Sequence, residues 1–120
     1  MDFLYVKIPV DRRSRDRLHR REDAVDQALR DAGLGSVAGW GDSLQADEPV
    51  GARSVAYTRV DVDVVDLAGA RALLRAALAS IGVPADTQIH YTIDHRRLED
   101  RWDGARWQLE QPVVEPHVHR

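Results

Sequence analysis

The chain has 120 residues and a formal net charge of −3, with 43% hydrophobic and 31% charged residues. These proportions are ordinary for a soluble globular domain and exclude a chain that is disordered throughout. The absence of cysteine excludes disulfides, a thiolate nucleophile and cysteine-ligated zinc, and it makes a reducing cytoplasm the simplest compartment.

The length fits a single domain covering residues 1–120. No apolar run reaches the ~20 residues that a membrane-spanning helix needs, so we expect no membrane partner. The richness in alanine, arginine, valine, aspartate and glycine is typical of a high-GC bacterial source.

The first segment, residues 2–10 ("DFLYVKIPV"), predicts a half-buried strand because its side chains alternate between two faces. One face carries Phe3, Tyr5 and Lys7, and the other carries Leu4, Val6 and Ile8.

Residues 11–21 ("DRRSRDRLHRR") hold six arginines and two aspartates, so a basic loop is attached to an acidic body. That asymmetry suits contact with a second copy or with a partner of mixed charge. Guanidinium groups also bind phosphate, but Asp11 and Asp16 and the lack of a glycine-rich cradle favour a solvated loop.

Residues 21–35 predict a helix that ends at Gly33, and residues 36–45 predict an edge strand with a bulge or close backbone approach at Gly39 and Gly41. Residues 46–52 are expected to form a loop.

Residues 53–65 ("RSVAYTRVDVDVV") predict the longest strand. Side chains two residues apart share a face, so Asp61 and Asp63 lie on one side together with Tyr57 and Arg59. The other side, formed by Val60, Val62 and Val64, is expected to pack on helices.

Residues 67–82 predict a second helix, and residues 87–94 ("TQIHYTID") predict another strand. In that strand Ile89, Tyr91 and Ile93 face one way. His90, Thr92 and Asp94 face the other way.

The order of these elements predicts an α+β fold of the ferredoxin-like βαββαβ type over residues 1–94. We expect a four-stranded antiparallel sheet with both helices on one face and with the first and third strands as neighbours. The opposite side is called the helix-free face. Its candidate binding residues are Phe3, Tyr5, Lys7, Tyr57, Arg59, Asp61, Asp63, His90 and Asp94.

Residues 95–112 predict a C-terminal hairpin or arm, because Asp103-Gly104 is a turn signal flanked by Trp102 and Trp107. The two tryptophans either pack together over an end of the sheet or bind a partner. Residues 113–120 are expected to form a mobile tail.

The helix-free face has three interpretations: a solvated surface with ion pairs, an interface with a protein partner or second copy, and a ligand or catalytic cleft. Its aspartates argue against single-stranded RNA, because they lie where phosphates would pass, and against nucleic acid as a partner in general.

Catalytic motifs are missing from the sequence, so no catalytic residue, metal ligand or cofactor is assigned. Two weaker hypotheses remain. His90 beside Asp61 or Asp63 would form an acid–base dyad, and His117 with His119 would bind a divalent metal through the tail.

Three stretches resemble small bacterial ferredoxin-like domains, including domains of uncharacterised function: "FLYVKIPV", "EDAVDQALRDAGLGSVAGWG" and "VDVDVVDLAGARALLRAALASIGVPADTQIHY". The resemblance covers Phe3 to about Asp94 and implies architecture alone. Relatives within that superfold include dimeric α+β-barrel enzymes, immunity proteins and regulatory ligand-binding domains.

We therefore expect a non-enzymatic, cytoplasmic interaction or regulatory protein, of the immunity or inhibitor kind, that binds through the helix-free face and the C-terminal hairpin. The alternative is a small dimeric enzyme or ligand-binding protein with an apolar pocket between sheet and helices. That pocket would be lined by Val62, Val64, Leu74, Leu78 and Tyr91.

Overall fold

The computed structural model describes residues 2–10, 20–43 and 56–113. These residues form two helices, α1 (Arg20–Ala32) and α2 (Leu67–Ser80). They also form strands β1 (Asp2–Val10), β2 (Gly35–Ser43), β3 (Ala56–Val64), β4 (Gln88–Ile93), β5 (Arg96–Trp102) and β6 (Trp107–Pro112). The predictions for residues 11–19, 46–52 and 114–120, including His117 and His119, concern segments outside the described residues.

The sheet has six strands in the order β2-β3-β1-β4-β5-β6, and all its pairs are antiparallel. The prediction of a four-stranded sheet with a separate hairpin was therefore wrong. The hairpin exists, but it continues the sheet: β5 pairs with β4 along its whole length, from Gln88 opposite Arg101 to Ile93 opposite Arg96.

A tight turn at Asp94 and His95 explains the extension of the sheet. Both residues have positive φ, 51° and 65°, as the two central residues of a type I′ hairpin turn require. Asparagine or aspartate followed by glycine usually marks such a turn. Asp94 matches the first of these positions, but His95 stands where glycine is expected. The chain then returns along the free edge of β4.

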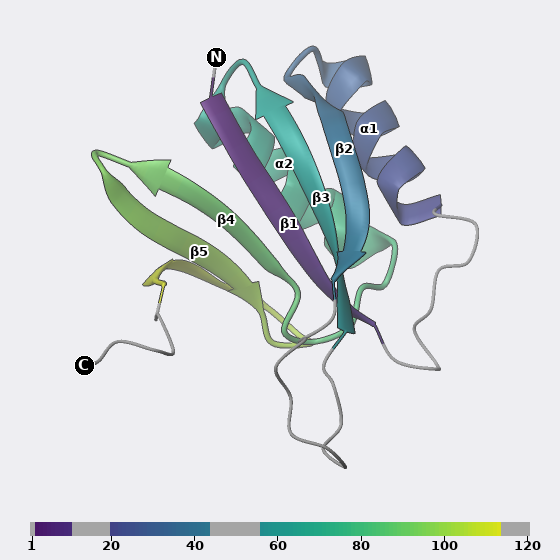
Figure 1. Ribbon diagram of the computed structural model, residues 1–120, viewed down its shortest axis with the longest axis vertical. Coiled ribbons are helices and arrows are strands. Elements are labelled where there is room, and N and C mark those ends of the chain that lie inside the picture. The colour runs from purple at the N-terminus through teal and green to yellow at the C-terminus, as the bar shows by residue number, and fades with distance from the viewer. Residues whose placement is uncertain (1, 11–19, 44–55, 114–120) are drawn as a thin grey trace.

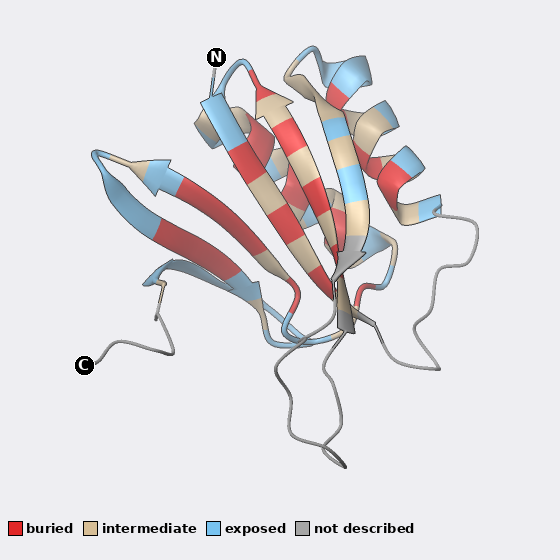
Figure 2. Cartoon of the chain, in the orientation of Figure 1, coloured by how far each residue is buried: buried red, intermediate tan, exposed pale blue. Residues whose placement is uncertain are grey.

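Both helices lie behind the sheet in the view of Figure 1 and contribute to one core. Val25 and Leu29 of α1 and Leu74 and Leu78 of α2 are fully buried in it. The sheet contributes its alternate residues: Leu4, Val6, Ile8, Val60, Val62, Val64 and Ile89. The predicted alternation of β1 and β3 is confirmed, and Figure 2 shows it as regular bands.

Strands β4 and β5 depart from alternation, since three consecutive residues of each are buried (Figure 2). The residues that break the alternation are His90 in β4 and Glu99 in β5, which are buried on the helix-free face. On the helix side the two strands bury a carboxylate. Asp100 is fully buried and accepts two bonds from Arg71 of α2, at 3.0 and 2.9 Å, and one from Arg75 at 3.0 Å. The Tyr91 hydroxyl donates at 2.7 Å and the Glu110 backbone N–H at 3.0 Å.

Burial alone would raise the pKa of Asp100, but hydrogen bonds from Arg71, Glu110 and Tyr91 outweigh it and lower the pKa. The pKa of Tyr91 is raised, first by burial and then by its bond to Asp100. This network connects β5 and β6 to α2, and no sequence motif predicted it.

Strand β2 carries the expected irregularity. Its register with β3 shifts between Val37 and Gly39, where one extra residue is accommodated as a bulge. Strand β6 is irregular as well, because its register with β5 shifts between Glu99 and Arg101 and Glu110 has a φ of 52°.

Candidate functional site

The pairing of residues between neighbouring strands shows which side chains lie on the helix-free face. Residues paired across an antiparallel sheet point to the same side. Tyr5 pairs with Asp61 on β3 and with His90 on β4, and His90 pairs in turn with Glu99 on β5. The charged residues of this face are Lys7, Arg59, Asp61, Asp63, Arg97, Glu99 and Arg101.

A stack of three side chains forms the centre of the face. The Tyr5 and His90 rings are nearly parallel, at 6°, with centroids 4.6 Å apart. The guanidinium carbon of Arg59 lies 3.9 Å from the centroid of the Tyr5 ring, and Lys7 Nζ lies 4.4 Å from that of Tyr57. Cation–π contacts of this kind fix both partners in one orientation.

His90 is buried although it lies on the face away from the helices, with 6% of its surface exposed. Its Nε2 is 2.8 Å from Gln88 Oε1, and its Nδ1 is buried without a hydrogen-bond partner. The predicted dyad with Asp61 or Asp63 is therefore not formed. Burial lowers the pKa of His90 to about 4, and four cations act in the same direction: Lys7, Arg97, Arg59 and Arg101.

The carboxylates of the face are held by its arginines. Arg59 Nε donates to Asp61 Oδ1 at 2.7 Å, and both side chains are partly exposed. Glu99 is almost fully buried and accepts from Arg101 Nε and Nη2 at 2.9 and 2.8 Å. The sequence analysis missed Arg97, Glu99 and Arg101, because Arg96 and Asp100 are charged as well and hide the period of two.

Two groups of predicted binding residues do not join this face. Asp94 lies in the turn after β4. Trp102 and Trp107 pair on the helix side, with ring centroids 5.2 Å apart, and Trp107 Nε1 donates to the Arg75 carbonyl at 3.0 Å. Their role in binding a partner stays a prediction, and it concerns a different surface.

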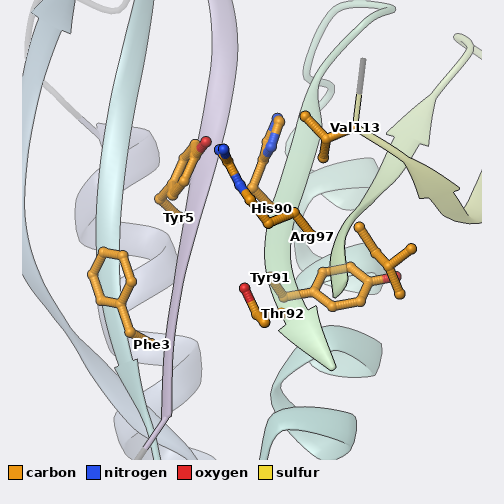
Figure 3. Close-up of a pocket in the computed structure, with 8 residues that line it drawn as sticks. Phe3, Tyr5, His90, Tyr91, Thr92, Arg97 and Val113 are labelled. Atoms are coloured by element: carbon orange, nitrogen blue, oxygen red, sulfur yellow. The ribbon is translucent and has the colours of Figure 1, made fainter. Parts of the chain in front are cut away.

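A crevice of about 50 Å³ lies between β1 and β4 (Figure 3). Its walls include Phe3, Tyr5, His90, Thr92 and Arg97. An open hollow of about 540 Å³ lies at the end of β3, beside Gly35, Ser36, Asp63 and Val65.

The apolar pocket expected between sheet and helices does not coincide with either of these hollows. Val62, Val64, Leu74 and Leu78 have no exposed surface and belong to one core cluster, and none of them lines either hollow. Tyr91, the fifth expected residue, reaches the small crevice.

Within the described ranges, no three His, Asp or Glu side chains gather as a metal site would require. No helix in the described part of the chain is long and apolar enough to cross a membrane. The chain matches no family model, no curated protein and no solved structure.

Proposed function

We propose that the protein is a non-enzymatic interaction protein that binds an acidic segment of a partner protein on its helix-free face. One observation carries the proposal. Lys7, Arg59, Arg97 and Arg101 surround a rigid aromatic centre on a face that no described helix covers.

The charge of the face supports an acidic partner. The whole chain is acidic, with a formal charge of −3, yet Lys7, Arg97, Arg59 and Arg101 all act on His90 at the middle of the face and lower its pKa. An acidic segment would therefore be attracted to this face.

The rigidity of the face supports binding by fixed anchors. Tyr5, His90 and Arg59 hold one another in position, and Phe3 has 49% of its surface exposed beside them. Preorganised aromatic and arginine side chains lose little entropy on association and are frequent hot spots.

The same stack favours a polypeptide over RNA. Bases bind to such sheets by stacking on free aromatic faces. Here Arg59 and His90 both lie against Tyr5, and Lys7 lies over Tyr57. Asp61, Asp63 and Glu99 are also placed between the cations, which suits a partner of mixed charge better than a chain of phosphates.

We keep the cytoplasm as the proposed compartment, since a chain without cysteine forms no disulfide that would require an oxidising one. A second copy of the chain is the alternative partner, and its acidic surfaces would supply the complementary charge.

Fluorescence anisotropy tests the proposal with three labelled probes: a glutamate-rich peptide, the same peptide with lysine in place of glutamate, and single-stranded RNA of equal charge. The double variant Lys7→Gln/Arg59→Gln should weaken binding of the acidic peptide about fivefold or more, at the level of two exposed charge contacts. The control Arg30→Gln/Arg106→Gln removes the same charge away from the face and should leave binding unchanged.

Asp63→Asn should change the affinity for the acidic peptide in the opposite direction. It removes a carboxylate from the same face, so the acidic peptide should bind more tightly. Equal losses in the two double variants would reduce the effect to overall charge and contradict the proposal. If RNA binds more tightly than the peptide, the partner is a nucleic acid and the proposed polypeptide partner is wrong.

A further inference from the structure

The crevice beside His90 exists because the ladder between β1 and β4 is short. It joins three residue pairs, Tyr5–His90, Val6–Ile89 and Lys7–Gln88, whereas β1 pairs with β3 from Asp2 to Val10. At Phe3, therefore, β1 continues along β3 while β4 has separated, and the crevice opens between them.

The volume of the crevice limits its ligand. Its size of about 50 Å³ exceeds the ~10–15 Å³ that one water needs and is far below the ~150 Å³ that holds benzene. A carboxylate group fits this space, and an aromatic ring does not.

Gln88 defines the protonation of the neutral His90 ring. Gln88 Nε2 donates to Asp86 Oδ1 at 3.2 Å, so its carbonyl oxygen faces His90 and accepts from Nε2–H at 2.8 Å. The neutral ring then carries its lone pair on Nδ1, which is buried and has no partner. A buried polar atom in that condition costs about 1–3 kcal/mol until a partner reaches it.

The hydrogen bond to Gln88 leaves Nδ1 on the other edge of a ring that lines the crevice. The two nitrogens of an imidazole point to different sides, and Nε2 points along β4 toward Gln88. Nδ1 is turned away from Gln88, and His90 is among the residues that line the crevice. Figure 3 shows Tyr5, His90 and Arg97 gathered at the crevice, with Arg97 reaching toward Tyr5.

We infer that the crevice binds one carboxylate group, with Arg97 as the charged donor, the Thr92 hydroxyl as a second donor and His90 Nδ1 as the buried contact. The inference rests on the proposed function, because a glutamate, aspartate or C-terminal carboxylate of the acidic partner would supply the group. A free small carboxylate has the same chemistry.

Binding takes up one proton. A carboxylate has no hydrogen to donate to Nδ1, so the ring accepts a proton from solvent and its new N–H donates to the carboxylate oxygen. The charged and titratable groups that face His90 are Tyr5 and Lys7 on β1, Arg59 and Asp61 on β3, and Arg97, Glu99 and Arg101 on β5. The bound anion offsets the cations among them and raises the pKa of the ring above its free value of about 4, so affinity falls as pH rises above about 4.

Imidazole ¹⁵N chemical shifts of His90 in the full chain provide the readout. Sodium acetate and the glutamate-rich peptide are titrated separately, with sodium chloride as the salt control. Saturable protonation of His90 by acetate identifies a site for free carboxylates, and protonation by the peptide alone identifies the partner's carboxylate. Either result supports the inference. No saturable shift, or the same shift with chloride, would overturn it.

Arg97→Gln should weaken carboxylate binding about tenfold, the value of one charge-assisted hydrogen bond. Arg96→Gln is the matched control, since it removes the same charge from the next residue, on the other face of β5. His90→Phe keeps a ring against Tyr5 and should abolish binding, followed through the Thr92 amide shift. Unfolding midpoints confirm that each variant is folded.

The two proposals fail in different ways. Dependence of peptide binding on Lys7 and Arg59, with no effect of any carboxylate on His90, would reject the crevice and retain the interaction surface. Carboxylate binding that depends on Arg97, with no effect of the Lys7→Gln/Arg59→Gln pair on the peptide, would retain the crevice alone.

Discussion

Replacing Asp100 with asparagine tests the network that attaches β5 and β6 to the remaining fold. The side chain has no exposed surface and accepts five hydrogen bonds, from Arg71, Arg75, Tyr91 and the Glu110 backbone. Asparagine has nearly the same shape. It carries no charge, however, and presents an N–H₂ group to neighbours that are themselves donors.

The expected loss of stability is about 3–5 kcal/mol, the range for removing one partner of a buried ion pair. Arg71 is the reason: only 9% of its side-chain surface is exposed, and its charge would lose its buried partner. Such a loss is a large part of the ~5–15 kcal/mol by which a domain is stable. Because the folded-state pKa of Asp100 is lowered, this contribution is present above about pH 4 and fades on further acidification.

Urea unfolding followed by tryptophan fluorescence measures the loss. The background variant Trp40→Phe leaves Trp102 and Trp107 as reporters of the β5–β6 region, while circular dichroism reports the whole chain. The control Asp61→Asn breaks the partly exposed pair with Arg59 and should cost less than about 1 kcal/mol.

Two results would refute this reasoning. A loss below about 1 kcal/mol for Asp100→Asn would show that the network contributes little. A loss equal to that of Asp61→Asn would show that burial does not control the energy of these pairs.

Two further predictions concern pH and backbone space. Because the pKa of His90 is about 4 in the folded protein and near 6.5 when unfolded, the unfolded chain binds more protons between these values. Stability should rise with pH from about 4 to about 6.5 by up to roughly 3 kcal/mol, and urea unfolding of His90→Phe should show a flatter profile. Gly35→Ala should destabilise by about 1–3 kcal/mol, because the new Cβ would clash with the Asp63 carbonyl oxygen, whereas Gly39→Ala has open space and should cost less in the same assay. Equal unfolding midpoints for the two glycine variants would contradict the clash.

The sequence predicted β1 and β3 well because a strand with helices on one side alone has the period of two that its residues display. Leu4, Val6, Val60 and Val62 are buried as expected, and Tyr5 and Asp61 lie opposite each other on the helix-free face. The short-range pattern of side chains was sufficient there.

The same reasoning failed for β5 because its burial depends on partners distant in sequence. Asp100 looks like a surface residue until Arg71, 29 positions earlier, is placed against it. Glu99 is buried beside Arg101, and the turn at Asp94 and His95 lacks the usual glycine. The sequence therefore assigned the helix-free face only in part: Tyr5, Asp61 and His90 were placed on it, and Arg97, which lines the crevice, was not.

The irregular outer strands affect how copies of the protein associate at high concentration. An outermost strand with a straight backbone offers a template on which further copies add, and filaments grow in this way. The bulge after Val37 in β2 and the left-handed Glu110 in β6 interrupt both templates. The two edges of the sheet are therefore poor templates for a further copy, even though no described helix covers its other face.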